Sequence, residues 1–205
     1  MESFLYFLDI AGTFVFAVSG AMAGVYKRLD VFGIAVLAFV TGTVGGIGRD
    51  LLIGAVPPLA IEEMRYLVTT TLAALLVFIG HRFFERMKNP VLLFDAAGLS
   101  LFCVAGSLRA LDFGISPFMA IMLGMLTGIG GGMVRDVLVN HIPAVLERDM
   151  FYATAAFAGA ALTVIGTKLS LPALPVWLTA AATCFALRYM ALRCGWRLPA
   201  PRIDD

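Results

Sequence analysis

The hydropathy of the chain rises in seven long apolar stretches, separated by short segments that hold charged residues and prolines. A membrane-spanning helix needs about 20 mostly apolar residues. We place approximate spans at 4–25, 31–56, 64–83, 91–110, 117–142, 150–168 and 174–194, of which the second and fifth are unusually long. Connections such as YKRLD and ERMKNP leave no room for a soluble domain. The pattern predicts one all-α transmembrane domain over residues 1–205.

The basic residues of the connecting segments predict the orientation of these spans, because cytoplasmic loops of membrane proteins are enriched in Lys and Arg. The side of the N-terminus holds three basic residues (Arg65, Arg109 and Lys168), and the opposite side holds ten (Lys27, Arg28, Arg82, Arg86, Lys88, Arg148, Arg188, Arg193, Arg197 and Arg202). We therefore expect a multi-pass protein of the plasma (inner) membrane, with the N-terminus outside and the C-terminus in the cytoplasm.

The chain contains an internal repeat with an offset of 86 residues. The segment GGIGRD at residues 45–50 returns as GGMVRD at residues 131–136, and the same offset relates other positions without a gap. Matched pairs include Asp9 and Asp95, Phe16 and Phe102, Thr41 and Thr127, and Tyr66 and Tyr152. Residues 9–80 and 95–166 are thus two copies of one unit. Each copy holds three spans, an odd number, so the second copy is inverted in the membrane, as in many transport proteins. The span at 174–194 is an extra C-terminal helix.

Four clustered glycines precede the charged residues in each copy, and they include Gly45 and Gly46 in the first copy and Gly131 and Gly132 in the second. Glycine costs about 1 kcal/mol relative to alanine inside a helix. We therefore expect spans two and five to be interrupted at these pairs, with the freed backbone groups lining a watery route. The alternative is that the glycines only allow close packing of helices.

The charged residues Arg49, Asp50, Arg135 and Asp136 lie inside apolar spans, where a charge must face the bundle interior or water. Adjacent residues of a helix point about 100° apart, so we expect that Arg49 and Asp50 do not pair with each other. Arg49 should lie on the outer side of the midplane and Arg135 on the inner side. One interpretation places these residues along a polar pathway, and the alternative treats them as salt bridges that lock the two repeats together.

The composition excludes a water-soluble protein, because 60% of residues are hydrophobic, only 14% are charged and the mean hydropathy is +0.93. A net charge of +1 without a basic cluster gives no indication of a nucleic-acid partner. Three scattered cysteines and two isolated histidines indicate neither a disulfide framework nor a metal site. We find no catalytic constellation, so we expect neither an enzyme nor a cofactor.

The repeated GGxxRD-type motif and the seven-span arrangement resemble the prokaryotic relatives of the trimeric intracellular cation (TRIC) channels. The resemblance implies a homotrimer with one pore in each subunit, which conducts potassium and sodium and is surrounded by kinked second and fifth helices. It places Gly45, Gly46, Arg49, Asp50, Gly131, Gly132, Arg135 and Asp136 on the ion pathway. The Lys-Glu-Val signature of the animal members is absent. Some bacterial relatives of the same domain are described as glycine transporters.

Three functions follow for comparison. The first is a passive monovalent-cation channel, the second is a carrier for a small amino acid such as glycine, and the third is a membrane scaffold without transport. The charged residues inside the spans count against the scaffold.

For the homotrimer we expect contacts through the apolar faces of spans one and four, where Gly12, Gly20, Gly98 and Gly106 permit close approach.

Overall fold

The computed structural model describes residues 2–84, 86–147 and 151–196, and within these ranges every regular element is a helix. Among the described residues seven helices are long, α3 is a single turn, and one short 3₁₀ helix (η1) follows α6. In chain order the elements are α1 (Glu2–Tyr26), α2 (Val31–Leu52), α3 (Leu59–Glu62), α4 (Met64–Phe84), α5 (Pro90–Asp112), α6 (Pro117–Leu138), η1 (Ala144–Leu146), α7 (Tyr152–Lys168) and α8 (Ala173–Cys194).

In the part of the chain that the structure describes, six of the long helices have the length and hydropathy needed to cross a membrane, namely α1, α2, α4, α5, α6 and α8. The seventh, α7, has 17 residues. At about 1.5 Å per residue it is roughly 26 Å long, which approaches the hydrocarbon thickness of a bilayer. The all-α membrane fold predicted from the sequence is confirmed.

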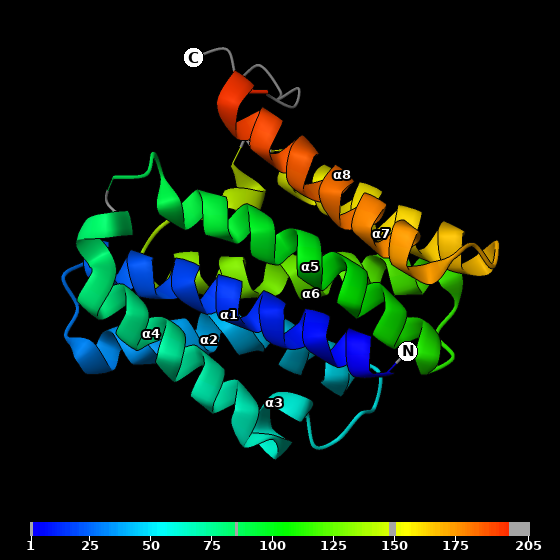
Figure 1. Cartoon of the computed structure of the whole chain (residues 1–205), viewed down its shortest axis with the longest axis horizontal. Helices are drawn as coiled ribbons and strands as arrows, with labels where there is room; N and C mark the ends of the chain where they lie inside the picture. Colours follow the sequence, from blue (N-terminus) through cyan, green and yellow to red (C-terminus); the bar gives the residue numbers. More distant parts are fainter. Residues whose placement is uncertain (1, 85, 148–150, 197–205) are drawn as a thin grey trace, which may run out of the picture.

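The two copies of the repeat pack around an approximate twofold axis. Figure 1 shows α1 and α5, the first helices of the two copies, running side by side in opposite directions. At their crossing Phe16 lies over Gly98 and Phe102 lies over Gly12, and the two rings are 5.4 Å apart. Such reciprocal contacts between equivalent residues are characteristic of a twofold interface. Helix α8 belongs to neither copy and packs on α7 and α5.

The second and fifth spans end earlier than the sequence analysis places them. Helix α2 stops at Leu52 and α6 at Leu138, so each has 22 residues, fewer than α1 with 25 and α5 with 23. Two residues beyond each end the chain takes a left-handed conformation, at Gly54 with φ 77° and at its repeat equivalent Asn140 with φ 56°. A left-handed residue terminates a helix and directs the chain away from its axis. The apolar residues beyond these points belong to the connecting segments.

The expected interruption of spans two and five is wrong, because α2 continues through Gly45 and Gly46, and α6 continues through Gly131 and Gly132. The glycines serve the crossing of these two helices. A Cβ on Gly45 would collide with the carbonyl oxygen of Thr127, and a Cβ on Gly131 would collide with the equivalent carbonyl of Thr41. Close packing therefore offsets the low helix propensity of glycine, as the packing alternative proposed.

The surface expected for trimer contacts also requires correction. Gly12, Gly20, Gly98 and Gly106 are all buried inside the protein. A Cβ on Gly20 would approach Thr41 Oγ1 to 2.5 Å, and one on Gly106 would approach Thr127 Oγ1 to 2.7 Å. These glycines accommodate neighbouring helices of the same chain, so they are not available to another subunit.

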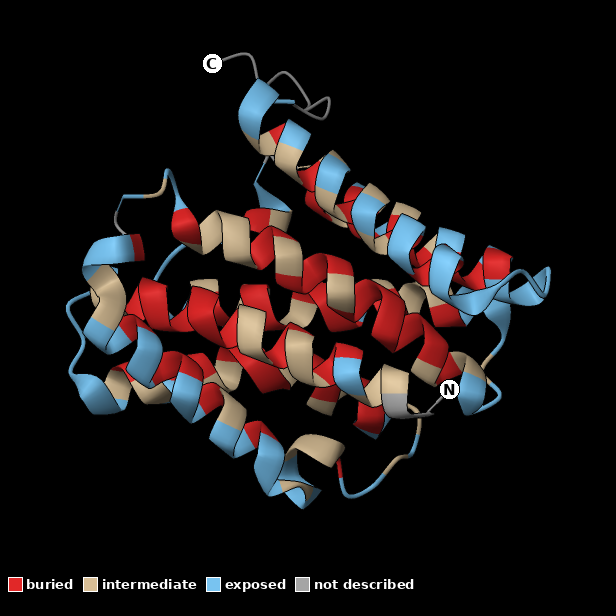
Figure 2. Ribbon diagram, viewed as in Figure 1, coloured by how far each residue is buried: buried red, intermediate tan, exposed pale blue. Residues whose placement is uncertain are grey.

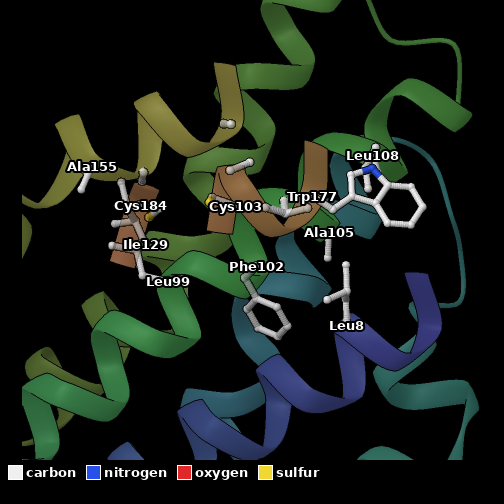
Figure 3. Packing of buried hydrophobic residues seen from close by; sticks show 14 of the residues in the cluster. Leu8, Leu99, Phe102, Cys103, Ala105, Leu108, Ile129, Ala155, Trp177 and Cys184 are labelled. Carbon is white, nitrogen blue, oxygen red and sulfur yellow. The ribbon is translucent and has the colours of Figure 1, made fainter. Parts of the chain in front are cut away.

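Burial is concentrated on α1 and α5, whereas the outer faces of α4 and α8 are exposed (Figure 2). The larger apolar core joins α1, α5, α6, α7 and α8, and it includes Leu8, Phe102, Trp177 and the two buried cysteines Cys103 and Cys184 (Figure 3). The exposed side chains on the outer helices are largely apolar, such as Ile79 on α4 and Leu178 on α8. This distribution fits a bundle whose outer surface faces lipid.

Candidate functional site

The first cluster of charged residues lies near the start of α1 and the end of α2, and it consists of Asp9, Arg49, Asp50 and Tyr66. Arg49 Nη1 lies 3.0 Å from Asp9 Oδ1, and the Tyr66 hydroxyl donates to Asp9 Oδ2 at 2.6 Å. Asp50 Oδ2 accepts a hydrogen bond from the backbone N–H of Leu59 at 3.1 Å. Three helices and the segment after α2 are therefore connected through buried charge-assisted hydrogen bonds.

Arg49 also pairs with its neighbour in sequence, contrary to our expectation. Its Nε donates to Asp50 Oδ1 at 2.9 Å. The Cβ atoms of adjacent residues diverge, but the long arginine side chain bends around the helix and reaches the carboxylate. The planar guanidinium then serves Asp9 and Asp50 with different nitrogen atoms.

The second cluster consists of Asp95, Arg135, Asp136 and Tyr152 and repeats the arginine–carboxylate pairs at the opposite end of the fold. The Tyr152 hydroxyl, unlike that of Tyr66, makes no hydrogen bond among the described residues. Arg135 Nη1 lies 2.8 Å from Asp95 Oδ1, and its Nε and Nη2 donate to Asp136 Oδ1 at 2.9 and 2.7 Å. Asp136 Oδ2 accepts from the backbone N–H of Ala144 at 3.0 Å. Tyr152 differs from Tyr66 in its surroundings, because the guanidinium of Arg188 from α8 lies 4.5 Å from the centre of its ring.

The strong ion pairs lie within each copy of the repeat. Arg49 with Asp9 belongs to the first copy, and Arg135 with Asp95 belongs to the second. Two contacts of the clusters cross between the copies: Arg135 Nη1 donates a hydrogen bond to the neutral Ser19 Oγ at 2.6 Å, and Arg109 Nε lies 3.9 Å from Asp50 Oδ1. The salt bridges therefore stabilise each copy more directly than they join the two.

A cavity leads to each cluster, and we call these cavities the first and second vestibules. The first has a volume of about 810 Å³ and is lined by charged residues of both signs, including Asp9, Arg49, Glu63, Arg65, Arg109 and Asp112. The second has about 270 Å³ and reaches Arg135 and Asp136. Equivalent positions line both cavities, for example Arg109 in the first and Ala23 in the second. The vestibules are thus related by the repeat but differ in size and charge.

Behind the ion pair of the first cluster lies a narrow void lined by Thr13, Gly42, Thr43 and Gly46, too small to admit a water molecule. Of the described residues, only Arg49, with its Nη2 at 3.8 Å, would lie within 4 Å of a Cβ on Gly46. The matching space beside Gly132 is filled, since a Cβ there would lie 2.6 Å from Asp95 Oδ1. Of the glycines named from the sequence, Gly46 and Gly132 adjoin the clusters, whereas Gly45 and Gly131 lie at the crossing of α2 and α6.

Several residues of the two clusters are absent from the site predicted from the sequence. Asp9, Asp95, Tyr66 and Tyr152 matched at the repeat offset, and buried polar residues duplicated in apolar spans were a usable signal. Arg188 was counted as a loop residue, but it is fully buried in α8. Its position inside an apolar span was the feature that could have indicated this.

Inverted three-helix copies, an additional helix and charged clusters inside the bundle define the chain as a helical membrane protein of the inverted-repeat class. The chain belongs to the family whose model is described as "Glycine transporter", and this model matches residues 6–82 and again residues 92–168.

Relatives align over nearly the whole chain. A UPF0126 membrane protein of Deinococcus radiodurans is 41% identical over 202 residues, which cover 98% of this chain and 94% of that protein. The UPF0126 inner membrane protein YadS of Escherichia coli K12 is 33% identical over 205 residues, which cover 98% of each chain.

Solved structures show the same fold. The TRIC trimeric intracellular cation channel orthologue from Rhodobacter sphaeroides superposes with a TM-score of 0.90 at 34% identity, over 95% of this chain and 100% of that chain. A prokaryotic TRIC channel crystallised in 0.5 M KCl gives a TM-score of 0.88 at 32% identity, over 97% and 100% of the two chains. The structural neighbours of this protein are therefore cation channels.

Proposed function

We propose that the protein is a passive channel for monovalent cations, potassium and sodium, with a separate route through each subunit of a homotrimer. The observation that carries the proposal is the pair of vestibules at opposite ends of the fold, each ending on a buried arginine–carboxylate cluster. The likeness to TRIC cation channels at about one-third identity supports the same reading. Following the charge distribution of its loops, the N-terminus lies outside the plasma (inner) membrane and the C-terminus in the cytoplasm.

The route runs from the first vestibule past Asp9 and Arg49 into the void beside Gly46, and from there along α2 and α6 to the second cluster. In the observed conformation the Arg49–Asp9 pair and the narrow void close this route. Conduction requires the pair to separate. Carboxylates stabilise a cation near the route, and the arginines raise the barrier to it, as charged rings do in other selective pores.

Charge substitutions test whether the arginines line the route. A unit charge about 5 Å from an ion contributes roughly 3 kcal/mol at an effective dielectric of about 20, and pairing with carboxylates reduces this to about 1 kcal/mol. Arg49→Ala and Arg135→Ala should therefore raise the unitary potassium conductance several-fold in planar bilayers. Asp50→Asn and Asp136→Asn should lower it, because they leave arginine charge uncompensated. Lowered melting temperatures with unchanged unitary conductance in all four variants would contradict a pore-lining role.

One observation favours a second function, a carrier for a small zwitterion such as glycine. The first vestibule presents three arginines and three carboxylates, a lining that can receive both a carboxylate and an ammonium group. Purified protein in liposomes separates the two functions. Potassium flux driven by its own gradient, without uptake of labelled glycine, supports the channel, whereas saturable glycine uptake without single-channel currents supports the carrier.

We infer the homotrimer from the likeness to the TRIC trimeric intracellular cation channel orthologue, which supports this assembly. Because the glycines of α1 and α5 are buried, the contacts between subunits must use other apolar surface. Native mass spectrometry in mild detergent should return three copies of the 21.9 kDa chain. A mass of one or two copies would contradict this assembly.

A further inference from the structure

Arg109, in the last turn of α5, has no counterpart in the other copy of the repeat. The equivalent position is Ala23, which lines the second vestibule as Arg109 lines the first. The Nε of Arg109 lies 3.9 Å from Asp50 Oδ1, the oxygen that accepts from Arg49 Nε at 2.9 Å. Arg109 therefore adds a positive charge to the first cluster from the side of the vestibule.

Arg109 is held much more loosely than the other arginines of the two clusters. Its side chain is 30% exposed, compared with 2% for Arg49 and 1% for Arg135. Its Nε makes no hydrogen bond within the described residues, and its guanidinium lies 5.0 Å from the ring centre of Phe113. A long side chain with a distant ion pair and an aromatic support at the cavity wall can rotate without breaking a short hydrogen bond.

The charge of the first cluster depends on this residue. Asp9 and Asp50 carry two negative charges and Arg49 one positive charge, so the three together have a net charge of −1. Arg109 neutralises this excess. A monovalent cation that approaches Asp50 through the vestibule would supply the same charge, and both cations cannot occupy this place together without repulsion.

We propose that Arg109 is a tethered cation that competes with permeating cations for Asp50 and thereby limits their access from the first vestibule to the Arg49–Asp9 pair. This proposal rests on the proposed cation conduction. Because Arg109 acts at one end of the route only, it makes the two directions of current unequal. When its guanidinium turns away from Asp50, the carboxylate is exposed to a permeating ion.

The test compares Arg109→Gln with Arg109→Lys and Arg65→Gln in single-channel recordings of purified protein in planar bilayers. Arg109→Gln should raise unitary potassium conductance about three- to tenfold in 0.1 M KCl, from the interaction of charges about 5 Å apart in a hydrated cavity. The increase should fall below twofold in 1 M KCl, because the screening length shortens from about 10 Å to about 3 Å. Arg109→Lys keeps the charge and should remain within twofold of the unmodified protein.

Arg65→Gln is the matched control. Arg65 lines the same vestibule and carries the same charge, but it is exposed and its guanidinium lies 5.3 Å from the ring centre of Tyr6 rather than beside Asp50. Its substitution should change conductance in 0.1 M KCl less than twofold. An equal increase in conductance for Arg65→Gln and Arg109→Gln would overturn the proposal. Such a result would mean that any positive charge in the vestibule lowers the conductance, whether or not it lies beside Asp50.

Further outcomes are equally decisive. An unchanged conductance in Arg109→Gln, or an increase that does not depend on the salt concentration, would also overturn the proposed role of Arg109. If the unmodified protein gives no current in either salt while it remains folded, the proposed channel function fails, whatever the variants do. Melting temperatures of the three variants check that each remains folded. A lower melting temperature of Arg109→Gln without a change in conductance would assign Arg109 a structural role only.

Discussion

The crossing of α2 and α6 gives a quantitative prediction for Gly45→Ala. The new Cβ would collide with the carbonyl oxygen of Thr127, which is a backbone atom held in α6. No rotation of a side chain can relieve this contact. The two helices must therefore separate by about 1 Å, which loosens the van der Waals contacts along their whole crossing.

The expected cost follows from two opposing effects. Overpacking of a close-packed interior destabilises a protein by about 1–3 kcal/mol, and the contact with backbone places this case at the upper end. The exchange of glycine for alanine in a helix returns about 1 kcal/mol. A net destabilisation of about 2 kcal/mol corresponds to a fall in melting temperature of about 4–8 °C for a chain of this size.

Gly48→Ala provides the control in the same helix. A Cβ at this position has nothing within 4 Å, so only the gain in helix propensity remains. We expect its melting temperature to rise by about 2–4 °C. The assay is thermal unfolding of both purified variants in one detergent, followed by tryptophan fluorescence and by loss of monodisperse protein. If the melting temperature of Gly45→Ala equals or exceeds that of the unmodified protein, these glycines do not serve the close crossing of the two helices.

Three further predictions concern the route and the topology. Gly46→Ala should raise the melting temperature by about 2–4 °C, as Gly48→Ala does, because its Cβ makes only an ordinary contact with Arg49 Nη2 at 3.8 Å. Gly46→Leu should abolish potassium flux by filling the void, and equal flux in both variants would exclude a route there. Asp9→Asn leaves the buried Arg49 with less compensation and should lower the melting temperature more than Tyr66→Phe, which removes one hydrogen bond; the reverse order would contradict the charge argument. Cys194, the exposed cysteine of α8, lies on the cytoplasmic side in the proposed orientation. A membrane-impermeant maleimide should therefore label it in inside-out vesicles but not in intact spheroplasts.

The sequence was sufficient for the all-α membrane fold and the repeat, because both depend on patterns that lie within the chain itself, but it placed the ends of spans two and five too late. It was also sufficient for the burial of Arg49 and Arg135, since a charge in an apolar span has few alternatives. It was misleading at Gly45 and Gly131. The propensity of a residue describes an isolated helix, and at these positions the contact with a second helix decides the conformation.

The partners of the charged residues could be deduced only in part. Cβ directions do not determine where a long side chain ends, so the Arg49–Asp50 hydrogen bond was excluded wrongly. Arg109 belongs to the second copy but acts on the first cluster, and Arg188 reaches the second cluster from a helix outside the repeat. Contacts of this kind depend on how separate helices are placed against one another, which the spacing of residues along the chain does not record.

The reciprocal contacts between the two copies have a consequence for how this protein can vary. Each copy has an odd number of long helices, so a chain with a single copy would have to insert in both directions and then find an oppositely inserted partner to form the crossing of Phe16 with Phe102. A covalent connection between the copies removes this search. It also allows the two copies to differ in sequence, because a substitution in one copy is not repeated in the other, as it would be in a pair of identical chains. The contrast between Arg109 in one copy and Ala23 at the equivalent position of the other is one such difference. In a pair of identical chains, an arginine at this position would line both vestibules.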